Sequence, residues 1–219
     1  MAAAEDIVLR PREAIRGARL LLVTDPRPDL AARVEAAVSG GVDVVQLRDK
    51  RASGEAREEL LPLAEELRGI CAREGALFTV NDDVELARLS EADGVHVGAE
   101  DEPVARAREI LGPDAVVGRS TGTVGEAREA VRGGADYLGV GTVFATPTKP
   151  DADVAGLALV RGVARARLSL PWFAIGGVTR ETAPEVVAAG APGLAVVRAI
   201  LDAADPEAAA RGLRSLLPG

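Results

Sequence analysis

Short apolar runs alternate with amphipathic stretches along the whole chain. The amphipathic segments are rich in alanine, glutamate and arginine and have helical periodicity, for example 29–39 and 125–132. Such alternation is typical of parallel strands joined by crossover helices, and eight strand–helix units are the number in a closed (β/α)8 barrel. The predicted strands are 19–25, 42–49, 77–82, 94–98, 115–121, 137–144, 171–178 and 193–200.

A short phrase containing glycine recurs before four of these strands. The copies begin at Ser39 (SGGVDVVQL), Ser90 (SEADGVHV), Arg132 (RGGADYLGV) and Ala188 (AAGAPGLAV). Glycine at a helix C-terminus adopts a left-handed backbone conformation and turns the chain into the next strand. A unit used four times favours a cyclic α/β architecture, and no Pro/Ser-rich linker divides the chain. We therefore expect one (β/α)8 TIM-barrel domain over residues 1–219, with a short N-terminal extension of about 1–18.

A doubly wound open sheet is the alternative fold. Its dinucleotide-binding members carry a G-x-G-x-x-G motif directly after the first strand. This chain instead continues LLLVTDPRPD from Leu20, which makes dinucleotide binding an unattractive interpretation.

Polar side chains follow a period of two at the ends of several predicted strands. In a parallel barrel, alternate residues face the lumen and the surrounding helices. Val45 and Leu47 then face outward, while Gln46, Arg48 and Lys50 face inward toward the barrel mouth. The same rule turns Phe78 and Val80 outward and Thr79 and Asn81 inward. Polar turn residues at strand ends are the ordinary alternative, but several such strands together predict a site at the C-terminal rim.

Charge adds a reason to expect an anionic ligand. Of 26 basic side chains only two are lysines, Lys50 in QLRDK and Lys149 in TPTK. Both follow an apolar run, and a lysine ammonium is a compact point charge suited to phosphate. An arginine-biased composition that left two lysines by accident is the alternative.

The bulk composition excludes several classes of function. A net charge of −8 argues against broad binding to nucleic acid or to an anionic membrane surface, and no apolar run is long enough to span a bilayer. The N-terminal segment MAAAEDIVLRPREAIRG lacks the apolar region of a secretory signal. The single cysteine, Cys71, rules out an internal disulfide and is best read as buried filler in a helix. We expect a cytoplasmic protein, and the oligomeric state stays open, a homo-oligomer included.

Two aspartates near neighbouring strand ends are candidate metal ligands. Asp82 and Asp101 could hold Mg²⁺, which takes few carboxylates together with waters and substrate phosphate oxygens. The alternative is a helix cap, because Asp82 followed by Glu85 matches a capping box. The lone histidine, His96, is expected to be a packed, hydrogen-bonded strand residue without a catalytic role.

Glycines and threonines late in the chain suggest a phosphate cradle. In the segment GVGTVFATPTKP, Gly139 and Gly141 would leave room for a ligand, and TPTK ends in hydroxyl and ammonium donors. The next predicted strand ends in Ile175-Gly176-Gly177. Loops after the seventh and eighth strands of such barrels commonly bind phosphate through backbone N–H groups.

These phrases together resemble the thiamine-phosphate synthase (thiamine-phosphate pyrophosphorylase) family. The matching pieces run in order from Leu21 to about Ile200: LLVTD, VVQLRDK, FTVNDDVELA, ADGVHVGAED, GADYLGVGTVFATPTKP, AIGGVT and GLAVVRAI. The resemblance implies a Mg²⁺-dependent transferase. In the reaction that the resemblance implies, the ring nitrogen of a thiazole phosphate bonds to the methylene of hydroxymethylpyrimidine diphosphate in a dissociative substitution. The products are thiamine phosphate and pyrophosphate. No general base is needed, because the nucleophile is an unprotonated ring nitrogen.

The resemblance also assigns roles to individual residues. It implies diphosphate contacts for Arg48, Lys50, Asn81 and Lys149, and Mg²⁺ ligation for Asp82 and Asp101. It implies that Gln46 and Ser120 orient the pyrimidine. The thiazole phosphate would be held by Thr146, Thr148, Gly177 and the region of Val197 and Arg198. Arg48, Lys50, Ser120 and Lys149 form the catalytic set in this interpretation.

Three positions depart from the family pattern. Ala99 stands where glutamine is usual, Gly122 where many members have histidine, and Arg198 where serine is common. The closest alternative is the thiazole tautomerase branch, whose chemistry depends on the histidine that Gly122 replaces. A non-catalytic thiamine-phosphate binding protein on the same scaffold is the third interpretation.

Overall fold

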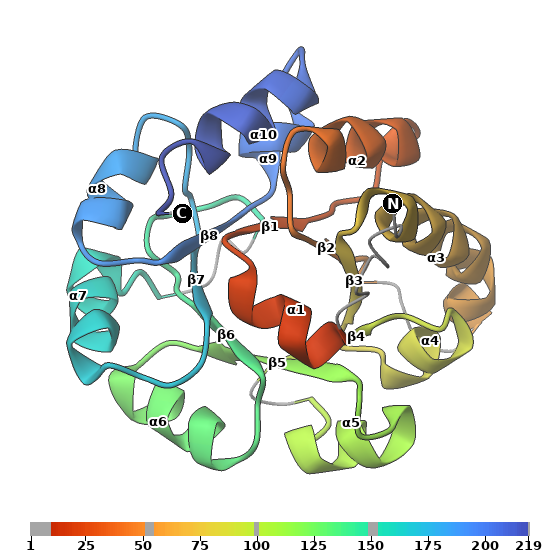
Figure 1. Cartoon of the computed structure of the whole chain (residues 1–219), viewed down its shortest axis with the longest axis horizontal. Helices are drawn as coiled ribbons and strands as arrows, with labels where there is room; N and C mark the ends of the chain where they lie inside the picture. Colours follow the sequence, from red (N-terminus) through yellow and green to blue (C-terminus); the bar gives the residue numbers. More distant parts are fainter. Residues whose placement is uncertain (1–9, 51–54, 99–100, 149–152, 219) are drawn as a thin grey trace, which may run out of the picture.

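The computed structural model describes residues 10–50, 55–98, 101–148 and 153–218. Eight parallel strands pair in chain order and close, with β1 hydrogen-bonded to β8 (Figure 1). This confirms the predicted (β/α)8 barrel. The strands are β1 (Leu20–Val23), β2 (Val44–Leu47), β3 (Leu77–Asn81), β4 (Gly94–Val97), β5 (Val116–Thr121), β6 (Tyr137–Val140), β7 (Trp172–Ile175) and β8 (Gly193–Val196).

Helices surround the barrel, and one helix lies across its opening (Figure 1). The helix across the opening is α1 (Pro11–Gly17), within the expected N-terminal extension. The others are α2 (Leu30–Ser39), α3 (Glu55–Glu74), α4 (Val84–Leu89), α5 (Val104–Leu111), α6 (Val124–Arg132), α7 (Gly156–Ala166), α8 (Ala183–Ala188), α9 (Arg198–Leu201) and α10 (Pro206–Arg214). Among the described residues, no helix is both long enough and apolar enough to cross a bilayer. The extent of the domain over 1–219 stays a prediction.

Two apolar layers lie on the two sides of the strands. The layer between strands and helices contains Val45, Leu47, Phe78 and Val80, as the period of two predicts. The layer inside the barrel is smaller, and its buried members are Ile15, Ala18, Leu21, Val23, Val44, Leu77, Val116, Tyr137, Phe173 and Ala195. In the described part of the chain the inner layer fills the lumen below the C-terminal ends of the strands.

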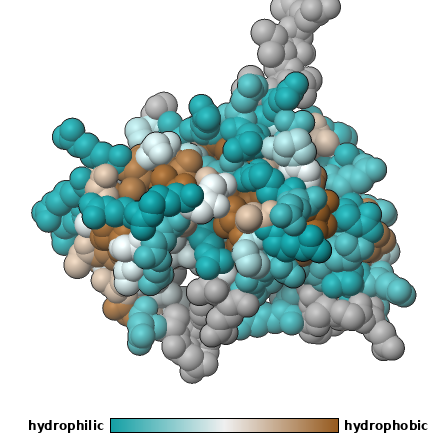
Figure 2. Space-filling model, turned by 90° about the horizontal axis from the view of Figure 1, so that it is seen from below, coloured by the Kyte–Doolittle hydropathy of each residue, from teal (hydrophilic) through white to brown (hydrophobic). Residues whose placement is uncertain are grey.

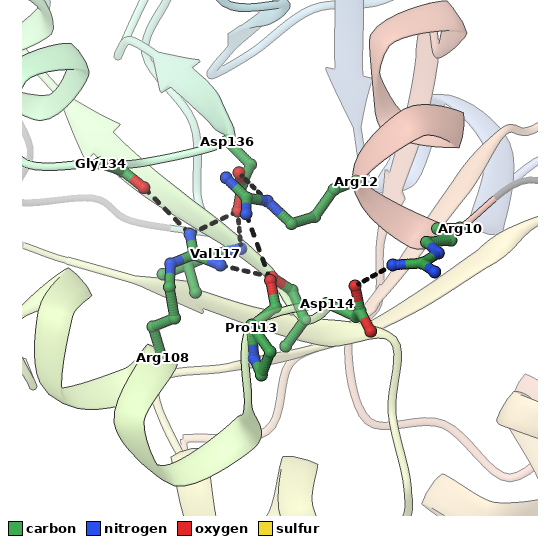
Figure 3. Close-up of polar contacts among 9 residues, drawn as sticks. Arg10, Arg12, Arg108, Pro113, Asp114, Val117, Gly134 and Asp136 are labelled. Carbon is green, nitrogen blue, oxygen red and sulfur yellow. Dashed lines mark hydrogen bonds and ion pairs between the residues drawn. The ribbon is translucent and has the colours of Figure 1, made fainter.

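Helix α1 closes the N-terminal end of the barrel. Ile15 is 1% exposed and belongs to the inner layer. Figure 3 shows the arginines that connect α1 and α5 to Asp136 at this end of the barrel. Arg12 donates to Asp136 at 2.8 Å, and Arg108 from α5 donates to the other oxygen of Asp136 at 2.7 Å. Arg10 makes a more exposed ion pair with Asp114.

The four recurring phrases have one physical explanation. They precede β2, β4, β6 and β8, and each contains one residue with positive φ, namely Gly41, Glu91, Gly134 and Gly190. In the first three copies an aspartate lies two residues after the residue with positive φ. Each of these aspartates accepts a backbone N–H near the start of the preceding strand: Asp43 from Leu20, Asp93 from Phe78, and Asp136 from Val117. The recurring phrase therefore ends a helix and, in its first three copies, also holds the start of the preceding strand in place.

We expect Asp136→Ala to destabilise the fold by about 2–4 kcal/mol, because it leaves a buried N–H and two guanidinium groups without their hydrogen-bond acceptor. Urea unfolding monitored by circular dichroism measures this change. Asp114→Ala is the matched control, since the Asp114 side chain is 65% exposed and its ion pair with Arg10 should contribute less than about 1 kcal/mol. Equal losses in the two variants would contradict the anchoring role of Asp136.

Cys71 is a buried core residue, as expected. Burial raises the pKa of its thiol to about 12, so the reactive thiolate is scarce at neutral pH. The native protein should therefore react with a thiol reagent at least about 100-fold more slowly than the protein in denaturant. Comparable rates of absorbance change in buffer and in urea would show that this helix opens readily.

Seven of the eight predicted strands run past the C-terminal ends of the observed strands, four of them by one or two residues. The three longest overruns are residues 141–144, 176–178 and 197–200, which lie beyond β6, β7 and β8. Gly176 and Gly177 have φ of 103° and 62°, which ends the extended backbone. Arg198, predicted within the eighth strand, instead begins α9. These apolar runs continue past the strands because the loops that follow are themselves packed at the barrel mouth.

The side of the barrel formed by α5 and α6 is shown in Figure 2. Hydrophilic side chains cover most of this face, and hydrophobic ones lie between them in separate patches. This side therefore offers no continuous apolar surface.

Candidate active site

A cavity of about 360 Å³ opens at the C-terminal ends of the strands, away from α1. It is lined by residues that belong to or follow every strand of the barrel. Most of the site residues predicted from the sequence line it: Gln46, Arg48, Lys50, Asn81, Asp82, Asp101, Ser120, Thr146, Thr148, Gly177, Val197 and Arg198. Lys149 and Ala99 lie outside the described residues. The fold thus brings the other predicted residues together, while their individual roles stay predictions.

Asp82 is not a helix cap. The N-cap of α4 is its neighbour Asp83, whose carboxylate accepts the Leu86 N–H at 2.8 Å and pairs with Arg57 at 2.8 Å. Asp82 has a left-handed backbone, with φ of 63°, and its N–H donates to the His96 carbonyl of the adjacent strand. The capping-box alternative for Asp82 and Glu85 is therefore wrong, and the Asp82 side chain is left to line the cavity.

The carboxyl groups of Asp82 and Asp101 face one another across the ends of β3 and β4. The pKa of Asp82 is raised to about 7 by partial desolvation at the cavity mouth together with the hydrogen bond and charge of Asp101, while Asn81 and Arg48 oppose the shift. Asp101 is held in place because one of its oxygens accepts the Gly98 N–H at 2.6 Å. A cation between two such acids would remove their mutual repulsion.

The donor set fits a hard divalent cation. Carboxylate oxygens in small number, completed by waters and phosphate oxygens, suit Mg²⁺. The described residues hold no group of three or more His, Cys, Asp or Glu that could bind a metal.

Cationic and amide groups from β2 and β3 lie in the same cavity. Arg48 and Lys50 follow β2, and Asn81 ends β3. The backbone of Arg48 is fixed because its N–H donates to the buried Thr24 hydroxyl at 3.0 Å. Positive charge is therefore placed beside the two facing carboxyl groups, where it could meet the oxygens of a metal-bound diphosphate.

The floor of the cavity is polar and buried. His96 is packed as expected, and its Nε2 lies 3.0 Å from the Ser120 hydroxyl. Burial lowers the pKa of His96 to about 4, with a further contribution from the charge of Arg119, so the ring is neutral near pH 7. His96 Nδ1 is buried without a hydrogen-bond partner in the described part of the chain, and the buried Tyr137 hydroxyl lies next to the side chains of Thr79 and Gln46.

Tyr137 lines the cavity although no sequence motif singled it out. Tyr137 begins β6 and lies two residues before Gly139, so both side chains point into the lumen. The alternation of inward and outward residues could therefore have predicted its place in the cavity. A Cβ on Gly139 would lie 3.2 Å from His96 Cε1, which confirms that this glycine leaves room in the cavity. Gly141 is glycine for another reason, because a Cβ there would lie 2.1 Å from the Ile175 carbonyl oxygen of β7.

A glycine turn follows β7, across the barrel from the two aspartates (Figure 1). A Cβ on Gly177 would lie 2.7 Å from the Ala145 carbonyl oxygen, and one on Gly176 would lie 2.5 Å from Thr142 Cγ2. Both positions therefore need glycine, and the loop after β6 packs directly on the turn. Thr179 also lines the cavity here, although the sequence analysis did not single it out.

Comparison with known proteins gives concordant matches. A family model described as thiamine monophosphate synthase matches residues 20–200. The chain is 49% identical to thiamine-phosphate synthase of Saccharopolyspora erythraea over 94% of this chain and 96% of that protein. It is 48% identical to the Synechococcus sp. (strain CC9311) enzyme of the same name, over 94% of this chain but only 59% of that protein. A solved structure, thiamine phosphate pyrophosphorylase from Pyrococcus furiosus, matches with a TM-score of 0.82 and 36% identity, covering 94% of this chain and 96% of the other.

Proposed function

Because the chain belongs to the thiamine monophosphate synthase family, we propose that it is a thiamine-phosphate synthase. The enzyme would transfer the hydroxymethylpyrimidine group of 4-amino-2-methyl-5-hydroxymethylpyrimidine diphosphate to 4-methyl-5-(2-phosphoethyl)thiazole. The products are thiamine phosphate and pyrophosphate. The observation that carries this proposal is the pair of facing carboxyl groups, Asp82 and Asp101, in one cavity with Arg48 and Lys50.

The β2–β4 side of the mouth suits the leaving group. Asp82 and Asp101 would hold Mg²⁺, which supplies charge neutralisation to the diphosphate when bound. Arg48, Lys50 and Asn81 would contact the diphosphate oxygens, and Lys149 is proposed to do the same from the TPTK motif. Negative charge grows on these oxygens as the methylene carbon–oxygen bond breaks, so fixed positive groups lower the barrier.

The polar floor suits the aminopyrimidine. Gln46 and Ser120 would orient the ring through hydrogen bonds, above the buried rings of His96 and Tyr137. A neutral His96 does not repel the positive charge that develops on the pyrimidine methylene as pyrophosphate departs. Its contact with Ser120 fixes a hydrogen-bonding pair rather than a proton relay.

The β6–β8 side of the mouth suits the second substrate. Thr146, Thr148, Gly177 and Val197 would bind the thiazole phosphate, which sets the thiazole nitrogen toward the pyrimidine methylene. That nitrogen has a free electron pair, so the new carbon–nitrogen bond forms without removal of a proton. Reaction then depends on positioning and on charge stabilisation, which is consistent with a cavity that lacks an ionised histidine.

The thiazole tautomerase alternative is not favoured. Its histidine position is occupied by Gly122, whose N–H donates to Glu126 at 2.7 Å, and the facing aspartates have no part in a tautomerisation. We also propose phosphorylated small molecules as the ligands and the cytoplasm as the location. A homo-oligomer is compatible with this function.

The decisive assay supplies both substrates with and without Mg²⁺ and follows pyrophosphate and thiamine phosphate. We expect equal amounts of the two products, formed only when both substrates and Mg²⁺ are present. Isomerisation of the thiazole without pyrophosphate release would favour the tautomerase. Tight binding of thiamine phosphate without turnover would favour the non-catalytic binding protein.

A further inference from the structure

Arg119 is a charged side chain on β5 that lies on the helix side of the barrel. Its neighbour Ser120 lines the cavity, so the alternation along a strand turns Arg119 the other way. Its register partner on β4, Val97, belongs to the apolar layer between strands and helices. Arg119 is half-buried there, and in the part of the chain that the structure describes it does not line the cavity. Its charge therefore needs an explanation other than contact with a substrate.

Arg119 and Asp101 bind the same glycine. The Arg119 guanidinium donates to the Gly98 carbonyl. One carboxylate oxygen of Asp101 accepts the Gly98 N–H at 2.6 Å, and the Asp101 N–H donates to the Gly98 carbonyl at 3.4 Å. Gly98 thus holds Asp101 through both of its backbone polar groups, and Arg119 holds Gly98.

The support that Arg119 gives to Gly98 comes from the barrel itself. Strand β5 pairs with β4 along the whole of Gly94–Val97, and Val97 lies opposite Arg119. Gly98 follows directly after β4, and a Cβ there would lie 2.8 Å from the Asp101 carboxylate oxygen. The carboxylate therefore packs closely on the end of β4, and the guanidinium ties this end to the neighbouring strand. Partners of this kind orient the ligands of metal sites.

The position of Asp101 matters because its carboxyl group faces that of Asp82. When both groups are ionised and no cation lies between them, they repel one another. If Asp101 were not held, it could move away from Asp82, and a cation would have to bring the two together again. That ordering would cost part of the binding free energy. A fixed Gly98 removes this cost before the metal arrives.

We infer that Arg119 is a positioning residue for the metal site, which holds Gly98 so that Asp101 can share a divalent cation with Asp82. The inference rests on the proposed function and extends it to a residue outside the cavity. Because Arg119 acts before the metal binds, its loss should weaken metal binding. The chemistry of the metal-loaded enzyme should stay the same.

The test compares Arg119→Met and Arg119→Lys with Arg106→Met. Methionine keeps much of the side-chain length but cannot donate, whereas lysine keeps the charge and a donor group. Arg106 is a matched control, because it lies on the adjacent α5, has a side chain that is 58% exposed, and pairs with Glu109 at 3.0 Å. Binding of Mn²⁺, which takes the same oxygen ligands as Mg²⁺, is followed without substrates from the electron paramagnetic resonance signal of the free ion.

For Arg119→Met we expect the dissociation constant of Mn²⁺ to rise about 10-fold, the lower end of the range for partners that orient metal ligands. Arg119→Lys should recover part of this affinity, and Arg106→Met should match the parent. In turnover, the half-saturating Mg²⁺ concentration should rise in parallel, while kcat at saturating Mg²⁺ stays within about twofold. A merely structural role would instead lower stability in urea and leave the Mn²⁺ affinity of the folded protein unchanged.

Two results would overturn the inference: an unchanged Mn²⁺ affinity in folded Arg119→Met, or a parent protein whose Mn²⁺ binding does not depend on Asp82. If Arg119→Met did not fold, Arg119→Lys would decide, since its affinity should then lie about threefold below that of the parent. A parent that binds Mn²⁺ through Asp82 but makes no thiamine phosphate would contradict the proposed function alone. The Mn²⁺ affinities of the variants would still decide the role of Arg119.

Discussion

Asp82→Asn is expected to lower kcat on the order of 100- to 1,000-fold, the cost of removing one group that stabilises developing charge. Asparagine is the preferred replacement because it keeps the size of the side chain and tolerates the left-handed backbone, with φ of 63°, better than alanine does. The barrel should stay folded, since Asp82 forms neither the α4 cap nor a strand-start contact. Initial rates of pyrophosphate release over a Mg²⁺ titration measure the effect, and the half-saturating Mg²⁺ concentration should rise.

Glu85→Gln is the matched control for Asp82→Asn. Glu85 lies three residues further on, has a side chain that is 41% exposed, and pairs only with Arg88 in the described structure. If Asp82 acted as part of a helix cap, the two substitutions would have similar, small effects on stability and rate. A normal rate for Asp82→Asn at limiting Mg²⁺ would remove the basis for the proposed metal site.

Gly139→Val should abolish most of the activity without unfolding the protein. A Cβ at this position already lies 3.2 Å from His96 Cε1, so the two methyl groups of valine would occupy the space above the cavity floor. Displacement of the pyrimidine by even about 1 Å would reduce kcat/KM on the order of 100-fold. Steady-state kinetics and direct binding of the pyrimidine diphosphate measure the loss, and valine suits a strand backbone.

Gly122→Ala is the control for this substitution. A Cβ on Gly122 meets nothing closer than 3.7 Å, and Gly122 does not line the cavity. Its rate should therefore stay close to that of the parent. If Gly139→Val retained full affinity for the pyrimidine diphosphate, the polar floor would not be the pyrimidine site.

The barrel could be predicted because its determinants are local. The period of two assigned Val45 and Leu47 to the helix side and Gln46 to the lumen, and neighbouring strands enforce the same parity. The recurring phrase was visible because each helix end needs a left-handed residue before the next strand. A sequence can show such features without any knowledge of which strands are neighbours.

The parts of the site that were missed depend on contacts between strands. Tyr137 and His96 share the cavity floor, with ring centroids 5.3 Å apart, although they come from β6 and β4. The choice of Asp83 rather than Asp82 as the α4 cap depends on Arg57, which lies in α3. The position of α9 depends on Arg27, which donates to the Leu201 carbonyl at the end of this helix, and on the burial of Ile200 and Leu201. Neither periodicity nor motif spacing contains that information.

The carboxylates at the two ends of the barrel have opposite consequences for evolution. Asp43, Asp93 and Asp136 bind strand starts at the closed end, so their loss endangers the scaffold. Asp82 and Asp101 face one another at the open end, where their proximity costs stability when no cation is present. A mutation at the open end can therefore change the chemistry at little risk to folding, and it can even make the protein more stable as activity falls. New specificities can arise at one end of this barrel while the other end stays the same.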